Sequence, residues 1–121
     1  MERHTRLEGL LVPQYILEHF EFESYEDLPN IIKVHVVEKN DAEHIPKEIF
    51  SEGKAVLDGY MNVLELQSFP TLGKEVFIYL KRRRWKLRGT TQGYHNTYEF
   101  TLEGMKATKE FGAFLKEIGR R

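Results

Sequence analysis

The sequence contains no cysteine among its 121 residues, and this absence removes several kinds of chemistry at once. Without cysteine there is no disulfide, no thiolate metal ligand and no cysteine nucleophile. The absence also fits a reducing compartment, in which disulfides are rare. We therefore expect a cytoplasmic protein.

Long apolar runs are missing as well. No window approaches the roughly 20 consecutive apolar residues that a membrane-spanning helix needs, and the first residues, Met1–His4, lack the apolar stretch of a signal peptide. Apolar residues make up 40% of the chain, which is enough for one modest core. We expect no membrane association and a single domain over residues 1–121.

Recognisable catalytic and ligand-binding motifs are also absent. The five histidines have no short metal-ligand spacing, and no cysteine supports them. The three serines are not flanked by the glycines of a nucleophile elbow. No glycine-rich phosphate loop opens a helix. The sequence therefore predicts a binding module with no metal, no cofactor and no enzymatic activity.

The order of elements favours an α+β fold, with an antiparallel sheet of four to six strands and a helix near each end of the chain. Strand periodicity is clearest where β-branched or aromatic residues alternate with other residues. The expected strands are Phe20–Tyr25, Ile31–Glu38, Tyr60–Leu66, Lys74–Leu80 with its continuation to Arg88, and Thr97–Leu102. We expect the first two to form an antiparallel hairpin, Leu64 and Leu66 to face inward, and Thr97–Leu102 to return after the basic strand as a second hairpin.

Helical spacing predicts one helix over Leu7–Phe20, regular from Val12 or Pro13, and another over Met105–Ile118. The second helix carries an apolar stripe that we expect to face the sheet. The stripe consists of Phe111, Phe114, Leu115 and Ile118. Residues Asn40–Phe50 read as a loop with one helical turn, which Asp41 is suited to cap.

Charge is divided unevenly along the chain, although the formal net charge is only -1. Residues 1–50 carry eleven acidic and five basic side chains, whereas residues 51–121 carry eight acidic and thirteen basic ones. Such asymmetry is typical of a protein whose basic half meets an anionic partner. Ordinary scatter of charge on a small domain gives the same totals.

The densest basic segment is the most specific feature of the sequence. On a strand, alternate side chains share a face, so Arg82, Arg84, Lys86 and Arg88 are expected to line one side. A cationic two-stranded ribbon fits the major groove and neutralises phosphates. The candidate DNA-binding residues are Lys81, Arg82, Arg83, Arg84, Trp85, Lys86 and Arg88.

Two alternatives stay open for this segment. The Trp85 ring can pack in the core, or it can stack on a base or an arginine. A strand rich in Lys and Arg can also serve only to protect a sheet edge from unwanted pairing.

Three segments resemble a known group of proteins. They read LVPQYILEHF over Leu11–Phe20, FPTLGKEVFIYLKRRRW over Phe69–Trp85 and EGMKATKEFGAFLKEI over Glu103–Ile118. The chain resembles the short N-terminal-region proteins of certain bacterial insertion-sequence transposases, whose catalytic domain is encoded separately. These in turn are similar to the zinc-ribbon head of a larger transposase family.

The chain departs from that larger family at the zinc ligands. Trp85 stands where a second cysteine pair would follow the arginines, and the place of the first pair falls in the loop Asp41–Ile49. The resemblance therefore implies no zinc and no catalytic residue. It implies a role in recognising or holding double-stranded DNA at transposon ends. As an alternative, the acidic first half, especially Glu18–Glu26, would dock a separate catalytic transposase subunit as a protein–protein adaptor.

Overall fold

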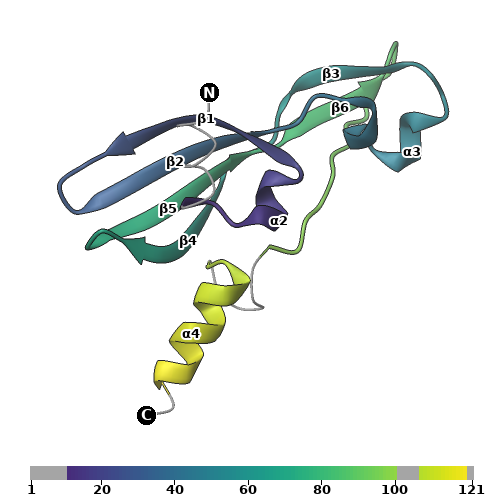
Figure 1. Ribbon diagram of the computed structural model, residues 1–121. Coiled ribbons are helices and arrows are strands. Elements are labelled where there is room, and N and C mark those ends of the chain that lie inside the picture. Colours follow the sequence, from purple (N-terminus) through teal and green to yellow (C-terminus); the bar gives the residue numbers. More distant parts are fainter. Residues whose placement is uncertain (1–10, 101–106, 120–121) are drawn as a thin grey trace.

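The computed structural model describes residues 11–100 and 107–119 and confirms an α+β fold (Figure 1). The described strands are β1 Phe20–Asp27, β2 Ile31–Glu38, β3 Ala55–Tyr60, β4 Leu64–Thr71, β5 Lys74–Lys81 and β6 Arg83–Leu87. The described helices are α2 Gln14–Leu17, the 3-10 turn η1 Ala42–His44, α3 Lys47–Phe50 and α4 Lys109–Gly119. None of these helices has the length and apolar character that a membrane span requires.

Four strands form the main sheet, in the order β1-β2-β5-β4. β1 pairs with β2 as the expected antiparallel hairpin, and β4 pairs with β5 in the same sense. The central pair, β2 and β5, is parallel, with Val34 opposite Ile78. The sheet is thus antiparallel apart from one parallel pairing, which periodicity along a single strand does not reveal.

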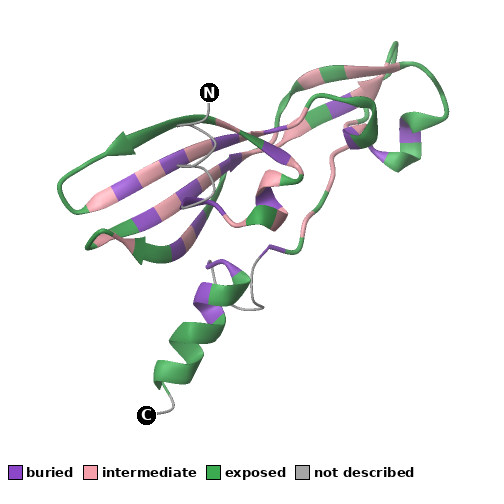
Figure 2. Cartoon of the chain, in the orientation of Figure 1, coloured by how far each residue is buried: buried purple, intermediate pink, exposed green. Residues whose placement is uncertain are grey.

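The core lies on one face of this sheet, where the inward-facing residues of β2 and β5 alternate with half-exposed ones (Figure 2). Ile16 of α2 and Phe100 pack against this face. The middle of each central strand is apolar at every second position, at Ile32, Val34 and Val36 in β2 and at Val76, Ile78 and Leu80 in β5, so burial of that parity fixes their register. The largest buried contributors are Phe20, Val34, Val36, Val76, Ile78 and Leu80.

A second, two-stranded sheet forms from β3 and β6, which pair antiparallel. We call it the β3–β6 ribbon, and it extends away from the main sheet in Figure 1. The expected hairpin between Lys81–Arg88 and a strand Thr97–Leu102 is wrong for residues 97–100, which are not strand, while residues 101–102 lie outside the described residues. Beyond β6 the return segment makes one antiparallel bridge, between Trp85 and Tyr94.

The expected strand Tyr60–Leu66 is also corrected. β3 ends at Tyr60, β4 begins at Leu64, and the residues between them are not in a strand. Leu66 faces inward as expected and is buried, whereas Leu64, at the strand end, is 40% exposed. Position at the end of a strand, rather than parity, decides the exposure of Leu64.

The C-terminal helix is shorter and less covered than its apolar stripe predicts. α4 begins at Lys109, while Met105 and Lys106 lie outside the described residues. Phe111 is buried against Phe69 of β4, with ring centroids 5.2 Å apart. The remaining residues of the stripe are exposed, contrary to the prediction, because only the first turns of α4 reach the sheet (Figure 2). Their exposed fractions are 46% for Phe114, 37% for Leu115 and 49% for Ile118.

Two shorter expectations have mixed outcomes. The N-terminal helix is corrected: Leu11 is helical, the chain leaves the helix at Val12 and Pro13, α2 covers only Gln14–Leu17, and Phe20 already belongs to β1. Residues 7–10 lie outside the described part. Asp41 does cap the turn η1, because its side chain accepts a hydrogen bond from the backbone N–H of His44.

Candidate nucleic-acid interface

The β3–β6 ribbon contains a bulge that sets the arrangement of its charges. Leu57 pairs with Trp85 and Tyr60 pairs with Arg83, so two residues of β3, Asp58 and Gly59, stand opposite one residue of β6. Gly59 has a φ of 79°, a conformation that glycine adopts without strain. A bulge of this kind redirects a neighbouring side chain.

Two cations of β6 lie close to Asp58. The Arg84 Nε atom is 3.6 Å from Asp58 Oδ2, and the Lys86 Nζ atom is 3.9 Å from Asp58 Oδ1. All three side chains are between 34% and 46% exposed. A Cβ at Gly93 would lie 2.5 Å from Arg84 Nε, so the guanidinium packs against backbone there. These pairs are long and exposed, and such pairs bind their partners weakly.

Arg88 continues the cationic side beyond the end of β6. Its side chain is exposed, and its backbone N–H donates to the carbonyl of Lys54 at 2.8 Å. This bond places the exposed Lys54 next to Arg88 at the end of the ribbon. Arg84 and Lys86 therefore share one side of β6, as their spacing predicts, and the exposed Arg88 follows just beyond the end of the strand.

The first three basic residues of the segment are instead tied to the main sheet or, in the case of Arg82, to the return segment. Arg83 donates from Nε to the Glu38 carbonyl at 2.8 Å, and Lys81 forms an ion pair of 3.4 Å with Glu23. Arg82 reaches the carbonyl of Asn96 at 3.5 Å, and its Nε atom is buried without a hydrogen-bond partner in the part of the chain that the structure describes. These residues are less available to a ligand than Arg84, Lys86 and Arg88.

Trp85 packs as a core residue and is only 5% exposed. Its backbone exchanges hydrogen bonds with Tyr94, at 2.8 and 2.7 Å, which closes the segment over it. Of the two alternatives for this ring, packing is the one that the structure shows. The ring is therefore not placed for stacking on a base, and we leave Trp85 out of the interface.

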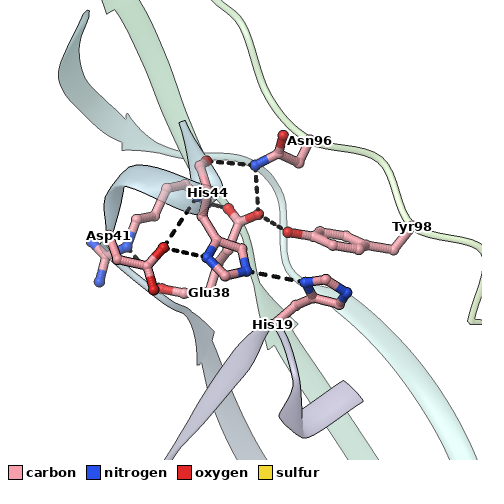
Figure 3. A network of polar contacts seen from close by, with 7 residues as sticks. His19, Glu38, Asp41, His44, Asn96 and Tyr98 are labelled. Atoms are coloured by element: carbon pink, nitrogen blue, oxygen red, sulfur yellow. Dashed lines mark hydrogen bonds and ion pairs between the residues drawn. The ribbon is translucent and has the colours of Figure 1, made fainter. Parts of the chain in front are cut away.

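Sequence reasoning missed a buried carboxylate that holds the basic segment in place (Figure 3). Glu38, at the end of β2, is 0% exposed. It accepts hydrogen bonds from the backbone N–H of Arg83 at 2.8 Å, from Asn96 Nδ2 at 3.1 Å and from the Tyr98 hydroxyl. A buried charge needs such donors. Glu38 thus joins the main sheet to the start of the ribbon.

A second series of hydrogen bonds, through His44, lies next to the contacts of Glu38. The His44 Nδ1 atom is 2.5 Å from Asp41 Oδ1, and His44 Nε2 is 3.0 Å from His19 Nδ1 (Figure 3). A carboxylate only accepts, so a neutral His44 carries its proton on Nδ1 and accepts from His19. The hydrogen bond from His44 holds the pKa of Asp41 below its ordinary value. Asn96 links the two series of hydrogen bonds, because its Nδ2, which donates to Glu38, also donates to the His44 carbonyl at 2.7 Å.

The environment of Glu38 also affects its tyrosine partner. Burial, followed by the hydrogen bond to Glu38 and the charge of that carboxylate, raises the pKa of Tyr98 far above its ordinary value. One sequence signal could have revealed this network. The inward positions of β2 are Ile32, Val34, Val36 and Glu38. The alternation therefore predicts that the Glu38 carboxylate lies on the core side, where it needs hydrogen-bond donors.

The other face of the main sheet is lined by half-exposed side chains. His35 stacks on Tyr79 of the neighbouring strand, with ring centroids 5.2 Å apart, and its Nε2 atom is 2.8 Å from Glu26 Oε2. The hydrogen bond from His35 lowers the pKa of Glu26. Burial and the carboxylates of Glu65 and Glu26 raise the pKa of Tyr79. This face therefore places carboxylates around an aromatic centre.

Among residues 11–100 and 107–119, no group of three or more histidine, aspartate or glutamate side chains is arranged to hold a metal ion. The candidate site therefore consists of the cationic side of the ribbon and the Glu38 network behind it. No family model, curated protein or solved structure matches this chain.

Proposed function

We propose that this chain is a DNA-binding module without catalytic activity, which holds double-stranded DNA against the cationic side of the β3–β6 ribbon. The resemblance to transposase N-terminal regions makes transposon-end DNA the expected duplex. It also makes the bacterial cytoplasm the expected location.

The observation that carries this proposal is the geometry of Arg84, Lys86 and Arg88. Arg84 and Lys86 share one side of a two-stranded ribbon, and Arg88 is exposed just beyond its end. A ribbon of this width enters the major groove, and its cations displace counterions from phosphates. Their only close carboxylate in the described structure is Asp58, at 3.6 Å or more. The cations are thus partly neutralised and still exposed to a ligand.

The experiment is a salt titration of binding to transposon-end and random duplexes. Each neutralised phosphate contributes a slope of roughly -0.9 to the dependence of log affinity on log salt, so three contacts give about -3. The double variant Arg84→Gln/Lys86→Gln should flatten this slope by about two. The fold should be retained, because exposed ion pairs contribute little to stability.

The matched control removes two positive charges from α4 with Lys109→Gln/Lys116→Gln. Both lysines are exposed and lie outside the ribbon. This variant should keep the wild-type slope. If the ribbon variant also keeps it, the cations of β6 protect a strand edge and do not bind DNA.

A second candidate function rests on the other face of the main sheet. On the edge strand β1, Glu21 and Glu26 share this face with His35, because they lie in register with Val37 and Lys33 of β2. Glu26 also contacts His35, which lies opposite Tyr79 of β5. Carboxylates around an aromatic centre complement a basic protein surface. We propose this face as the docking surface for a catalytic transposase subunit if the chain acts as an adaptor.

A further inference from the structure

The bulge in β3 places a carboxylate where a nucleic-acid phosphate would have to bind. The Asp58 oxygens lie 3.6 Å from Arg84 and 3.9 Å from Lys86, on the side of the ribbon to which the interface is assigned. A regular β3 would pair one residue with Arg84, whereas the bulge offers Asp58 and Gly59. The positive φ of Gly59 allows this extra residue without strain.

We propose that Asp58 regulates this interface as an internal competitor for the phosphate-binding cations. The inference rests on the proposed DNA-binding function and adds a gate to the same site. Asp58 and a phosphate oxygen are both anionic acceptors, so they compete for the same N–H donors of Arg84 and Lys86. A duplex must displace the carboxylate before both cations reach its backbone.

This competition lowers affinity for phosphate backbones in general. The loss is smaller where the carboxylate finds a donor on the duplex, and in the major groove such donors are the amino groups of cytosine and adenine. Asp58 therefore acts as a selectivity residue. Asp58 weakens binding to every duplex. The loss of affinity is larger at sites that offer only phosphate charge than at sites where a base amino group lies near Asp58.

The test is the isosteric variant Asp58→Asn. Its affinity for random duplex should rise about fivefold, the factor that corresponds to the upper energy of an exposed ion pair. Its salt slope should stay near the wild-type value of about -3, because the same three cations contact phosphates in both proteins once the duplex is bound. Glu52→Gln is the matched control, since it removes one exposed carboxylate near the ribbon that makes no ion pair within the described residues.

A heparin column separates failure of this inference from failure of the proposed function. On heparin, Asp58→Asn should elute at higher salt than both the wild type and Glu52→Gln. If the two variants elute together, net charge explains the effect and the gate is refuted, whatever happens with DNA. If Asp58→Asn shifts on heparin but neither it nor the wild type binds duplex, the gate stands for another polyanion and the DNA proposal fails.

Discussion

At the scale of single residues, Glu38 decides how the basic segment is presented. Its carboxylate and carbonyl together receive four hydrogen bonds from Arg83, Asn96 and Tyr98, and the Asn96 amide also donates to the His44 carbonyl nearby. Because Glu38 is fully buried, each donor offsets part of the cost of removing its charge from water. The ribbon is therefore attached to the sheet by polar contacts as well as by covalent connection.

The Tyr98 hydroxyl is the donor whose loss is easiest to follow. Tyr98→Phe should lower the free energy of unfolding at pH 7 by about 1–3 kcal/mol, because a buried acceptor loses a partner. Burial and Glu38 raise the pKa of Tyr98 above its ordinary value of 10.0. Its stabilisation is therefore complete below pH 10.0 and declines as pH rises above that value.

Urea unfolding of the wild type and Tyr98→Phe between pH 8 and about pH 11 would measure this effect. The stability difference between the two proteins should shrink above pH 10.0, because the variant has no hydroxyl there to deprotonate. Tyr25→Phe, which changes an exposed tyrosine of β1, is the control. A difference that stays constant across this range would contradict the assigned role of Tyr98.

At the scale of elements, the strands with the cleanest alternation and the β1–β2 hairpin were predictable, and the remaining pairings were not. β2 and β5 carry β-branched or aliphatic residues at every second position, and both appear within one residue of the expected bounds. Asp58 and Gly59 interrupt the alternation of β3, so the sequence did not predict this strand. Its partner β6 is distant in sequence, and no local pattern encodes such a pairing.

The turn between β4 and β5 contains a local strain that can be relieved. Leu72 has a φ of 54° and is 90% exposed, and the following Gly73 has a φ of 76°. Two positive φ values in a two-residue hairpin turn favour Asn-Gly over Leu-Gly. Leu72→Asn should therefore stabilise the protein by about 0.5–1 kcal/mol, which raises Tm by roughly 3 °C.

Thermal unfolding would measure this gain, and Gly73→Ala is the opposite control. An added Cβ at Gly73 meets no atom within 4 Å, so only the backbone conformation opposes the change. Gly73→Ala should lower stability by about 1 kcal/mol. Equal melting temperatures for the wild type and Leu72→Asn would show that the turn is not strained.

At the scale of the whole molecule, the two signs of charge lie on different parts of the fold. The acidic strand β1 is an edge of the main sheet, the cations Arg84 and Lys86 belong to the ribbon, and Arg88 follows at its end. This separation corresponds to the uneven division along the sequence, since β1 belongs to residues 1–50 and both strands of the ribbon belong to residues 51–121. The uneven division did not predict Asp58, because a bulge that brings a carboxylate to the basic strand depends on tertiary pairing.

The last prediction uses this separation to distinguish the adaptor from the DNA-binding module. Glu21→Lys/Glu23→Lys raises the formal net charge from -1 to +3, because each change adds two charges. If β1 docks a basic catalytic subunit, association in a pull-down with that subunit should weaken about tenfold or more, since like charges then face each other. DNA binding through the ribbon should stay the same or strengthen.

The matched control is Glu43→Lys/Glu48→Lys, which makes the same change of net charge on η1 and α3, where both glutamates are exposed. A loss of association confined to the β1 variant assigns docking to that strand, because long-range charge effects are common to both proteins. Equal losses in both variants would attribute association to net charge. Unchanged affinity in the β1 variant would reject the adaptor, and the carboxylates of β1 would then serve only to keep an exposed sheet edge from pairing.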